Sequence, residues 1–281
     1  DKNNSYNIKV GADYNLTDKS TLSFSTMINQ GKHDDEEYIW YHFIGNSISP
    51  DSLYRRDTDT KSDFTGIDLD LAFKQYFAAP GRVLSIQATS SMNSDDELNK
   101  YYQQNYIDES TPDYSVPAEL QNDELNEVND VYTFSADYEH PIGEDKKLEG
   151  GLKSTLRYID DDFYSESFDT ASGEFLNNTD LTNRFVYNDG VHAFYAQYRQ
   201  SIGKFGIQAG LRSEYAQRES ELKNTGENFT KDYFSLFPSA FISWKPNAAW
   251  QVKVSYSRRI NRPRTGQLNP FATYDDPLNI R

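Results

Sequence analysis

The chain of 281 residues has a formal net charge of −16, from 44 acidic and 28 basic residues, and it contains no cysteine. This acidity excludes a nucleic-acid partner, because the surface repels phosphates, and the lack of cysteine excludes disulfides, zinc–thiolate sites and thiol nucleophiles. The aromatic fraction of 15% is too high for a disordered chain, and the sequence lacks the apolar run of about 18 residues that a transmembrane helix needs.

Alternation of apolar and polar residues with a period of two recurs along the chain and predicts pairs of β-strands. Tight turns rich in Gly, Pro, Asp and Asn join the two strands of each pair. The predicted pairs, in chain order, are 8–16 with 22–28, 67–73 with 84–92, 132–138 with 148–158, 194–202 with 205–214, and 234–244 with 250–257. We therefore expect about ten antiparallel strands in an all-β fold, with each strand next to its neighbours in sequence.

Between these pairs the alternation stops, which predicts long polar loops at 31–61, 94–130 and 160–182 and a shorter one at 222–231. Short and long connections thus alternate strictly along the chain. Outer-membrane barrels have this asymmetry, and a tilted strand needs roughly 9 to 11 residues to cross a bilayer, whereas strands of ordinary sheets average about five or six. The pattern favours an up-and-down transmembrane β-barrel whose apolar face meets the lipid of an outer membrane.

The polar face of the predicted strands carries charged residues near mid-strand, among them Lys9, Asp70 and Arg212. A charge facing lipid costs about 2 to 4 kcal/mol, so we expect these residues to face a wet or polar-filled lumen. A soluble, secreted β-sandwich that binds glycans also alternates, with its apolar face packed inward, and stays open as an alternative.

No catalytic motif is present in the sequence, and the four histidines lack the spacing of metal ligands. The acidic clusters at 95–97 and 160–162 also lack the spacing of a calcium-binding loop. We therefore predict no enzyme activity, no metal site and no cofactor.

Aromatic residues in the first two predicted loops are the candidate ligand-binding residues. They are Tyr38, Trp40, Tyr41, Tyr101 and Tyr102. Such rings could stack on a sugar or another planar ligand, or they could rest on the membrane interface.

The last third of the chain carries a set of spaced motifs. Phe237-Pro238-Ser239 begins one strand and Ser255 to Ile260 ends the next, followed by Arg262-Pro263 and Leu268-Asn269-Pro270-Phe271. Over roughly 185–281, this arrangement resembles TonB-dependent outer-membrane receptors, and most of all the outer-membrane β-barrel family of Bacteroidetes-type bacteria. The residues that we expect to be structural on this ground are Pro238, Tyr256, Arg259, Arg262, Pro263, Leu268, Asn269, Pro270 and Phe271.

The resemblance implies energy-coupled uptake of a nutrient ligand through a barrel of about 22 strands, plugged by an N-terminal domain and driven by the TonB system. Residues 1–281 are then expected to be a single, incomplete barrel segment that lacks the plug, the leader peptide and the final strands. A non-transporting barrel or a passive porin is the alternative function.

Overall fold

One antiparallel sheet contains almost all of the residues that the structure describes. The computed structural model describes residues 2–45, 51–262, 274–276 and 279–280. Ten long strands follow one another across the sheet in chain order, which confirms the expected antiparallel meander. Their bounds are β1 (Lys2–Thr17), β2 (Ser20–Phe43), β3 (Ser52–Tyr76), β4 (Val83–Asp108), β6 (Glu119–Ile142), β7 (Lys146–Asp169), β9 (Asn183–Ile202), β10 (Phe205–Leu222), β11 (Glu227–Asn247) and β12 (Trp250–Ser257).

Four short strands complete the description. β5 (Thr111–Pro112) pairs with β4, and β8 (Glu174–Asn177) pairs with β7. β13 (Tyr274–Asp276) and β14 (Asn279–Ile280) form a separate two-stranded pair. The described residues include no helix that is long and apolar enough to cross a membrane.

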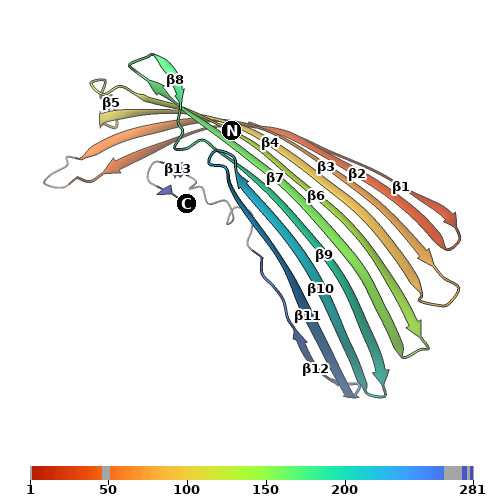
Figure 1. Ribbon diagram of the computed structural model, residues 1–281. Helices are drawn as coiled ribbons and strands as arrows, with labels where there is room; N and C mark the ends of the chain where they lie inside the picture. Colours follow the sequence, from red (N-terminus) through yellow and green to blue (C-terminus); the bar gives the residue numbers. More distant parts are fainter. Residues whose placement is uncertain (1, 46–50, 263–273, 277–278, 281) are drawn as a thin grey trace.

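The main sheet is a single curved layer, with the short turns at one end and the longer connections at the other (Figure 1). Two of the short turns place a glycine in the left-handed region, Gly143 with a φ of 70° and Gly203 with a φ of 56°. A β-sandwich needs a second sheet packed on the apolar face of the first, and the described part of the chain contains no such sheet. The sandwich alternative is therefore wrong.

The predicted long loops are mostly strand, which corrects the expectation from the sequence. β2 and β3 take up most of 31–61, β4 and β6 most of 94–130, β7 and β8 most of 160–182, and β10 and β11 meet across a connection of only 223–226. Alternation of hydrophobicity reports what surrounds the two faces of a strand, and it disappears where both faces meet water. The backbone ladder continues there all the same, with cross-strand ion pairs such as Lys32 with Asp63 at 2.8 Å.

The register assigns every strand residue to one of two faces, because residues directly opposite each other lie on the same face. The ladders from β2 through β10 to β11 run without a register shift, so one assignment carries across the sheet. The mid-strand charges all lie on one face, as expected: Lys9, Asp13, Asp68, Asp70, Asp137, Glu139, Lys153, Arg157, Arg199, Arg212, Glu214 and Lys253. We call this the inner face and the opposite one the outer face.

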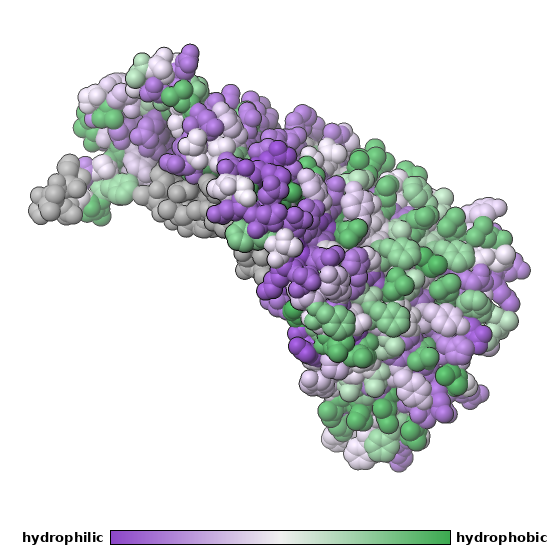
Figure 2. All heavy atoms as spheres, viewed as in Figure 1, coloured by the Kyte–Doolittle hydropathy of each residue, from purple (hydrophilic) through white to green (hydrophobic). Residues whose placement is uncertain are grey.

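The outer face carries an apolar band next to the short turns. Its side chains are large and exposed, with Val10 at 59%, Leu211 at 50% and Val254 at 65% exposed. Figure 2 shows hydrophobic residues gathered over this half of the strands and hydrophilic residues over the other half. Soluble proteins rarely expose apolar patches larger than a few hundred square ångströms, so this band is a lipid-facing surface.

The long strands continue far beyond the apolar band. On the outer face the band ends at Ile28 on β2, Ile67 on β3, Met92 on β4, Tyr132 on β6 and Tyr158 on β7. β3 alone has 25 residues, which at about 3.3 Å per residue spans about 80 Å, against a band about 25 Å tall in outer-membrane barrels. More than half of the length of β2, β3, β4 and β6, and nearly half of that of β7, therefore projects past the membrane.

Candidate functional site

The five predicted aromatic residues lie on the projecting ends of β2 and β4, on strands rather than in loops. Cross-strand register separates them into two groups. Tyr41 and Tyr101 lie on the inner face, whereas Tyr38, Trp40 and Tyr102 lie on the outer face. The structure therefore does not bring all five together into one site, although Tyr38, Tyr101 and Tyr102 line one hollow. Their role in ligand binding stays a prediction.

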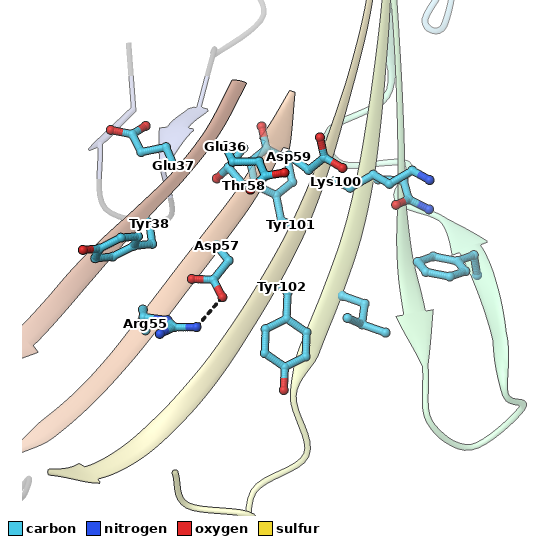
Figure 3. Close-up of a pocket in the computed structure, with 13 residues that line it drawn as sticks. Glu36, Glu37, Tyr38, Arg55, Asp57, Thr58, Asp59, Lys100, Tyr101 and Tyr102 are labelled. Atoms are coloured by element: carbon cyan, nitrogen blue, oxygen red, sulfur yellow. Dashed lines mark hydrogen bonds and ion pairs between the residues drawn. The ribbon is translucent and has the colours of Figure 1, made fainter. Parts of the chain in front are cut away.

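The outer-face group surrounds an arginine. The Arg55 guanidinium carbon lies 5.8 Å from the ring centroids of both Tyr38 and Trp40 and 5.9 Å from that of Tyr106. Arg55 Nη2 also donates a hydrogen bond of 2.6 Å to Asp57 Oδ2. The pair lies in a hollow of about 620 Å³. Tyr102, Lys100 and the carboxylates of Glu36 and Asp59 also line this hollow (Figure 3). Because Arg55 already makes cation–π contacts with the three rings, this group has its partner within the protein.

The inner-face group is more buried and more polar. The Arg56 guanidinium carbon lies 4.0 Å from the ring centroid of Tyr101, and Tyr41 stacks on Tyr54 at 4.7 Å. Burial, together with the negative charge of Asp123, raises the pKa of Tyr101 to about 12, so its hydroxyl group stays protonated at physiological pH. An arginine and aromatic faces thus line the inner wall above the membrane.

Asp123 is fixed next to this group by hydrogen bonds. It accepts one of 2.6 Å from the fully buried Ser165 hydroxyl and two of 2.9 Å from the Gln121 amide. Burial raises the pKa of Asp123, and the hydrogen bonds from Ser165 and Gln121 oppose that shift. The inner wall is therefore preformed here, since its polar groups hold one another in place before any ligand arrives.

The balance of charge on the inner face differs between strands. At membrane level, β3 and β6 carry Asp68, Asp70, Asp137 and Glu139, whereas β7, β9, β10 and β12 carry the cations Lys153, Arg157, Arg199, Arg212 and Lys253 together with the acids Glu149, Asp189 and Glu214. One side of the lumen wall is thus mainly acidic and the other mainly basic. Such a wall exerts a sideways field that orients dipolar or charged solutes.

Arg262 is the motif residue with the clearest structural role. Its side chain reaches the inner face, where it donates to the Glu214 carboxylate and, over 3.0 Å, to the Tyr233 hydroxyl. Arg212 holds the other oxygen of Glu214 at 2.5 Å. Since Arg262 lies 48 residues from Glu214 in the chain, nothing in the spacing indicated this partner.

The other motif residues lie at the end of the wall. Pro238 lies within β11, and its carbonyl oxygen accepts a hydrogen bond of 3.2 Å from the Arg258 amide. Tyr256 is 62% exposed in the apolar band, and Arg259 follows β12. Pro263, Leu268, Asn269, Pro270 and Phe271 lie outside the described residues, so their structural role stays a prediction.

The histidines and acidic clusters have local partners. His192 Nδ1 lies 2.8 Å from the Ser154 hydroxyl, and Asp160 accepts hydrogen bonds of 2.9 and 2.8 Å from Arg184. The acidic clusters at 95–97 and 160–162 both lie on strands, so neighbouring carboxylates point to opposite faces. Within the part of the chain that the structure describes, no group of three His, Cys, Asp or Glu side chains could hold a metal ion.

Comparison with known protein families shows which family the chain belongs to. The model of the outer membrane protein beta-barrel family matches residues 75–281. The chain belongs to this family. As a member of the outer membrane β-barrel family, it is a protein of the Gram-negative outer membrane, and its apolar band faces lipid. No protein of curated function matches its sequence.

Solved structures with a similar arrangement of strands include transport proteins of larger size. They include the unliganded ferric citrate transporter FecA, with 12% identity, a TM-score of 0.37 and coverage of 89% of this chain and 43% of that chain. The ferric yersiniabactin uptake receptor FyuA from Yersinia pestis has 10% identity, a TM-score of 0.37 and coverage of 89% and 44%. P. aeruginosa FpvA, bound to a heterologous pyoverdine with iron, has 11% identity, a TM-score of 0.42 and coverage of 89% and 40%. The outer membrane β-barrel chain described here spans less than half the length of each.

Proposed function

We propose that the chain is a wall segment of an outer-membrane uptake receptor. The observation that carries this proposal is the polar, preformed inner wall of the projecting strands, with Arg56 against Tyr101 and Asp123 fixed beside them. Such a wall can capture a ligand above the membrane by stacking and charge-assisted hydrogen bonds. The charged inner face below it then offers a wet route through the bilayer. The proposed function includes no catalytic role for the chain.

The energy source proposed is the TonB system, acting on an N-terminal plug. The support is the spaced motif set from Pro238 to Phe271, which resembles that of TonB-dependent receptors, including the Bacteroidetes-type family. Residues 1–281 are proposed to form one incomplete wall domain of the full barrel. In this proposal the plug fills the lumen, and it moves when the coupling protein pulls on it after a nutrient ligand has bound outside.

A passive porin is the competing function, because a charged lumen wall also suits diffusion of small solutes. The two functions differ in whether the lumen is blocked at rest. The full-length protein should be reconstituted in liposomes and osmotic swelling measured in a small neutral sugar, in parallel with a variant from which the N-terminal plug is deleted.

The receptor proposal expects no swelling with the full-length protein and rapid swelling with the plug-deleted variant. Heat-modifiable migration on gels, which reports a folded barrel, serves as the control for both samples. Rapid swelling with the folded full-length protein would show an open pore and would overturn the receptor proposal in favour of the porin.

A further inference from the structure

A second hollow, of about 490 Å³, lies on the inner face of β9–β12 near the short turns. Arg199 and Lys253 supply two cations to its lining. The remaining inner-face side chains are neutral: Ser201, Gln208, Ser243, Gln251 and Phe241. No carboxylate belongs to this lining among the described residues, although the chain as a whole has a net charge of −16. We call it the basic hollow.

The register explains how the basic hollow forms. Ser201, Gly206 and Ser243 lie side by side on adjacent strands, so the two serine hydroxyls flank a position without a side chain. A Cβ atom on Gly206 would lie 2.7 Å from the Ser243 Oγ atom and would occupy the floor between them. The Ser243 hydroxyl leans over Gly206, 3.5 Å from its carbonyl oxygen, so the absence of a side chain at Gly206 makes room for this hydroxyl on the floor of the hollow.

The two cations lie on strands at opposite sides of this floor. Arg199 is on β9 and Lys253 is on β12, with β10 and β11 between them. Arg199 turns toward β10, where its Nε and Nη2 atoms donate hydrogen bonds of 3.2 and 3.0 Å to Gln208 Oε1. A guanidinium has five N–H donors, so donors remain on Arg199 for a ligand.

We propose that the basic hollow binds the anionic group, carboxylate or phosphate, of a solute in the lumen. Two cations, two hydroxyl groups and the amide N–H groups of Gln208 and Gln251 all donate to such a group. The hollow lies at the short-turn end, which is the periplasmic end in bacterial barrels. An anion that travels along the basic side of the wall, past Arg212, would reach this hollow last.

The inference rests on the proposed uptake function only for the route by which the solute arrives. Binding at equilibrium requires no transport, but a plug that fills the lumen would cover the hollow, so the plug-deleted variant is needed to test the two proposals separately. The full-length protein and the plug-deleted variant, in detergent micelles at low ionic strength, should each be titrated by calorimetry with inorganic phosphate and, separately, with succinate. The test variant is Arg199→Gln/Lys253→Gln, and the matched control is Lys9→Gln/Lys153→Gln, which removes the same charge from the inner face elsewhere.

We expect the wild-type protein to bind at least one of the two anions, and the tighter anion identifies the group that the hollow prefers. Loss of both cations should weaken this binding about tenfold or more, while the control should stay within about twofold. Heat-modifiable migration verifies that both variants are folded. Equal weakening in both variants would show a general charge effect and overturn the proposal. Binding to the plug-deleted variant alone would show that the plug covers the hollow at rest and would support the proposal. Absence of binding to both the full-length protein and the plug-deleted variant would overturn it.

Discussion

Asp161 on β7 lies directly opposite Glu127 on β6, so two carboxylates share one stretch of the inner face beyond the apolar band. Burial, followed by the negative charges of Glu127 and Asp160, raises the pKa of Asp161 to about 6. Burial and the charge of Asp95 raise the pKa of Glu127 as well. The pair therefore takes up a proton at a pH well above the usual value for carboxylates.

The first prediction concerns stability against pH. Because the pKa of Asp161 is raised by folding, its contribution to stability is full below its ordinary pKa of 3.8 and is lost as pH rises through about 6. Asp161→Asn should then be more stable than wild type at pH 8 by about 1 kcal/mol, after allowance for solvent screening. Urea unfolding of the full-length protein in micelles at pH 5 and pH 8 measures this difference.

Asp162→Asn is the matched control, since Asp162 lies on the outer face, 3.6 Å from Arg184. It should give no gain at pH 8. A gain of the same size in both variants would show that reduced net charge alone, and not the inner-face pair, explains the effect.

The second prediction tests the two faces in β12. Val254→Arg places a charge in the apolar band, which costs about 2 to 4 kcal/mol near the bilayer midplane. We expect this variant to lose membrane assembly, whereas Ser255→Arg, on the inner face, should assemble. Heat-modifiable gel migration of outer-membrane fractions reports assembly. Equal yields of folded barrel from the two variants would contradict the assigned faces.

The third prediction uses two adjacent glycines of β7. A Cβ atom on Gly151 would lie 2.5 Å from Asp137 Oδ1, 2.7 Å from the Ala136 carbonyl oxygen and 2.8 Å from the Tyr195 ring. Since backbone cannot move aside easily, Gly151→Ala should destabilise the barrel by about 1 to 3 kcal/mol. The measurement is urea unfolding in micelles.

Gly150 provides the comparison, because the nearest atom to its added Cβ would be the Tyr195 carbonyl oxygen at 3.4 Å, an ordinary contact. Gly150→Ala should be neutral or slightly stabilising. If Gly151→Ala were equally harmless, the close packing of Tyr195 on this strand would not constrain the wall.

The fourth prediction concerns Arg262. Arg262→Gln leaves the Glu214 carboxylate, whose side chain is 8% exposed, with Arg212 as its remaining cation. We expect faster backbone hydrogen exchange in peptides that cover 227–262, because removal of a charged partner from a buried group costs about 1 to 3 kcal/mol. Mass spectrometry of the full-length protein in micelles resolves these peptides. Arg259→Gln should exchange like the wild type, and identical exchange in both variants would exclude an anchoring role for Arg262.

The sequence was enough to predict the number of strands and their two faces within the membrane. Val252 and Val254 alternate with Lys253 and Ser255, and this alternation is imposed by lipid on one side and water on the other. The sequence was not enough to predict the strands beyond the membrane. There both faces meet water, as at Asp34 to Tyr38, so the hydrogen-bonded strands show no alternation of hydrophobic and polar residues.

The candidate site could be predicted from the sequence only in part, for a similar reason. Tyr101 and Tyr102 are adjacent in sequence, yet they lie on opposite faces because they sit on one strand, and a loop assignment concealed this. The ion pair of Arg262 with Glu214 and the basic hollow both join residues of different strands. They depend on which strands lie beside one another in the sheet and in which register. Single-strand patterns contain no information about such contacts.

The projecting ends of β3 and β4 also determine how the ligand preference of the proposed receptor could evolve. A capture surface built on a hydrogen-bonded ladder is already ordered, so a ligand need not meet the cost of about 1 to 2 kcal/mol for each loop residue fixed on binding. Its specificity resides in alternate side chains on a constant backbone. New ligand preferences can then arise by single substitutions at inner-face positions, without insertions or deletions that would disturb the register of the wall.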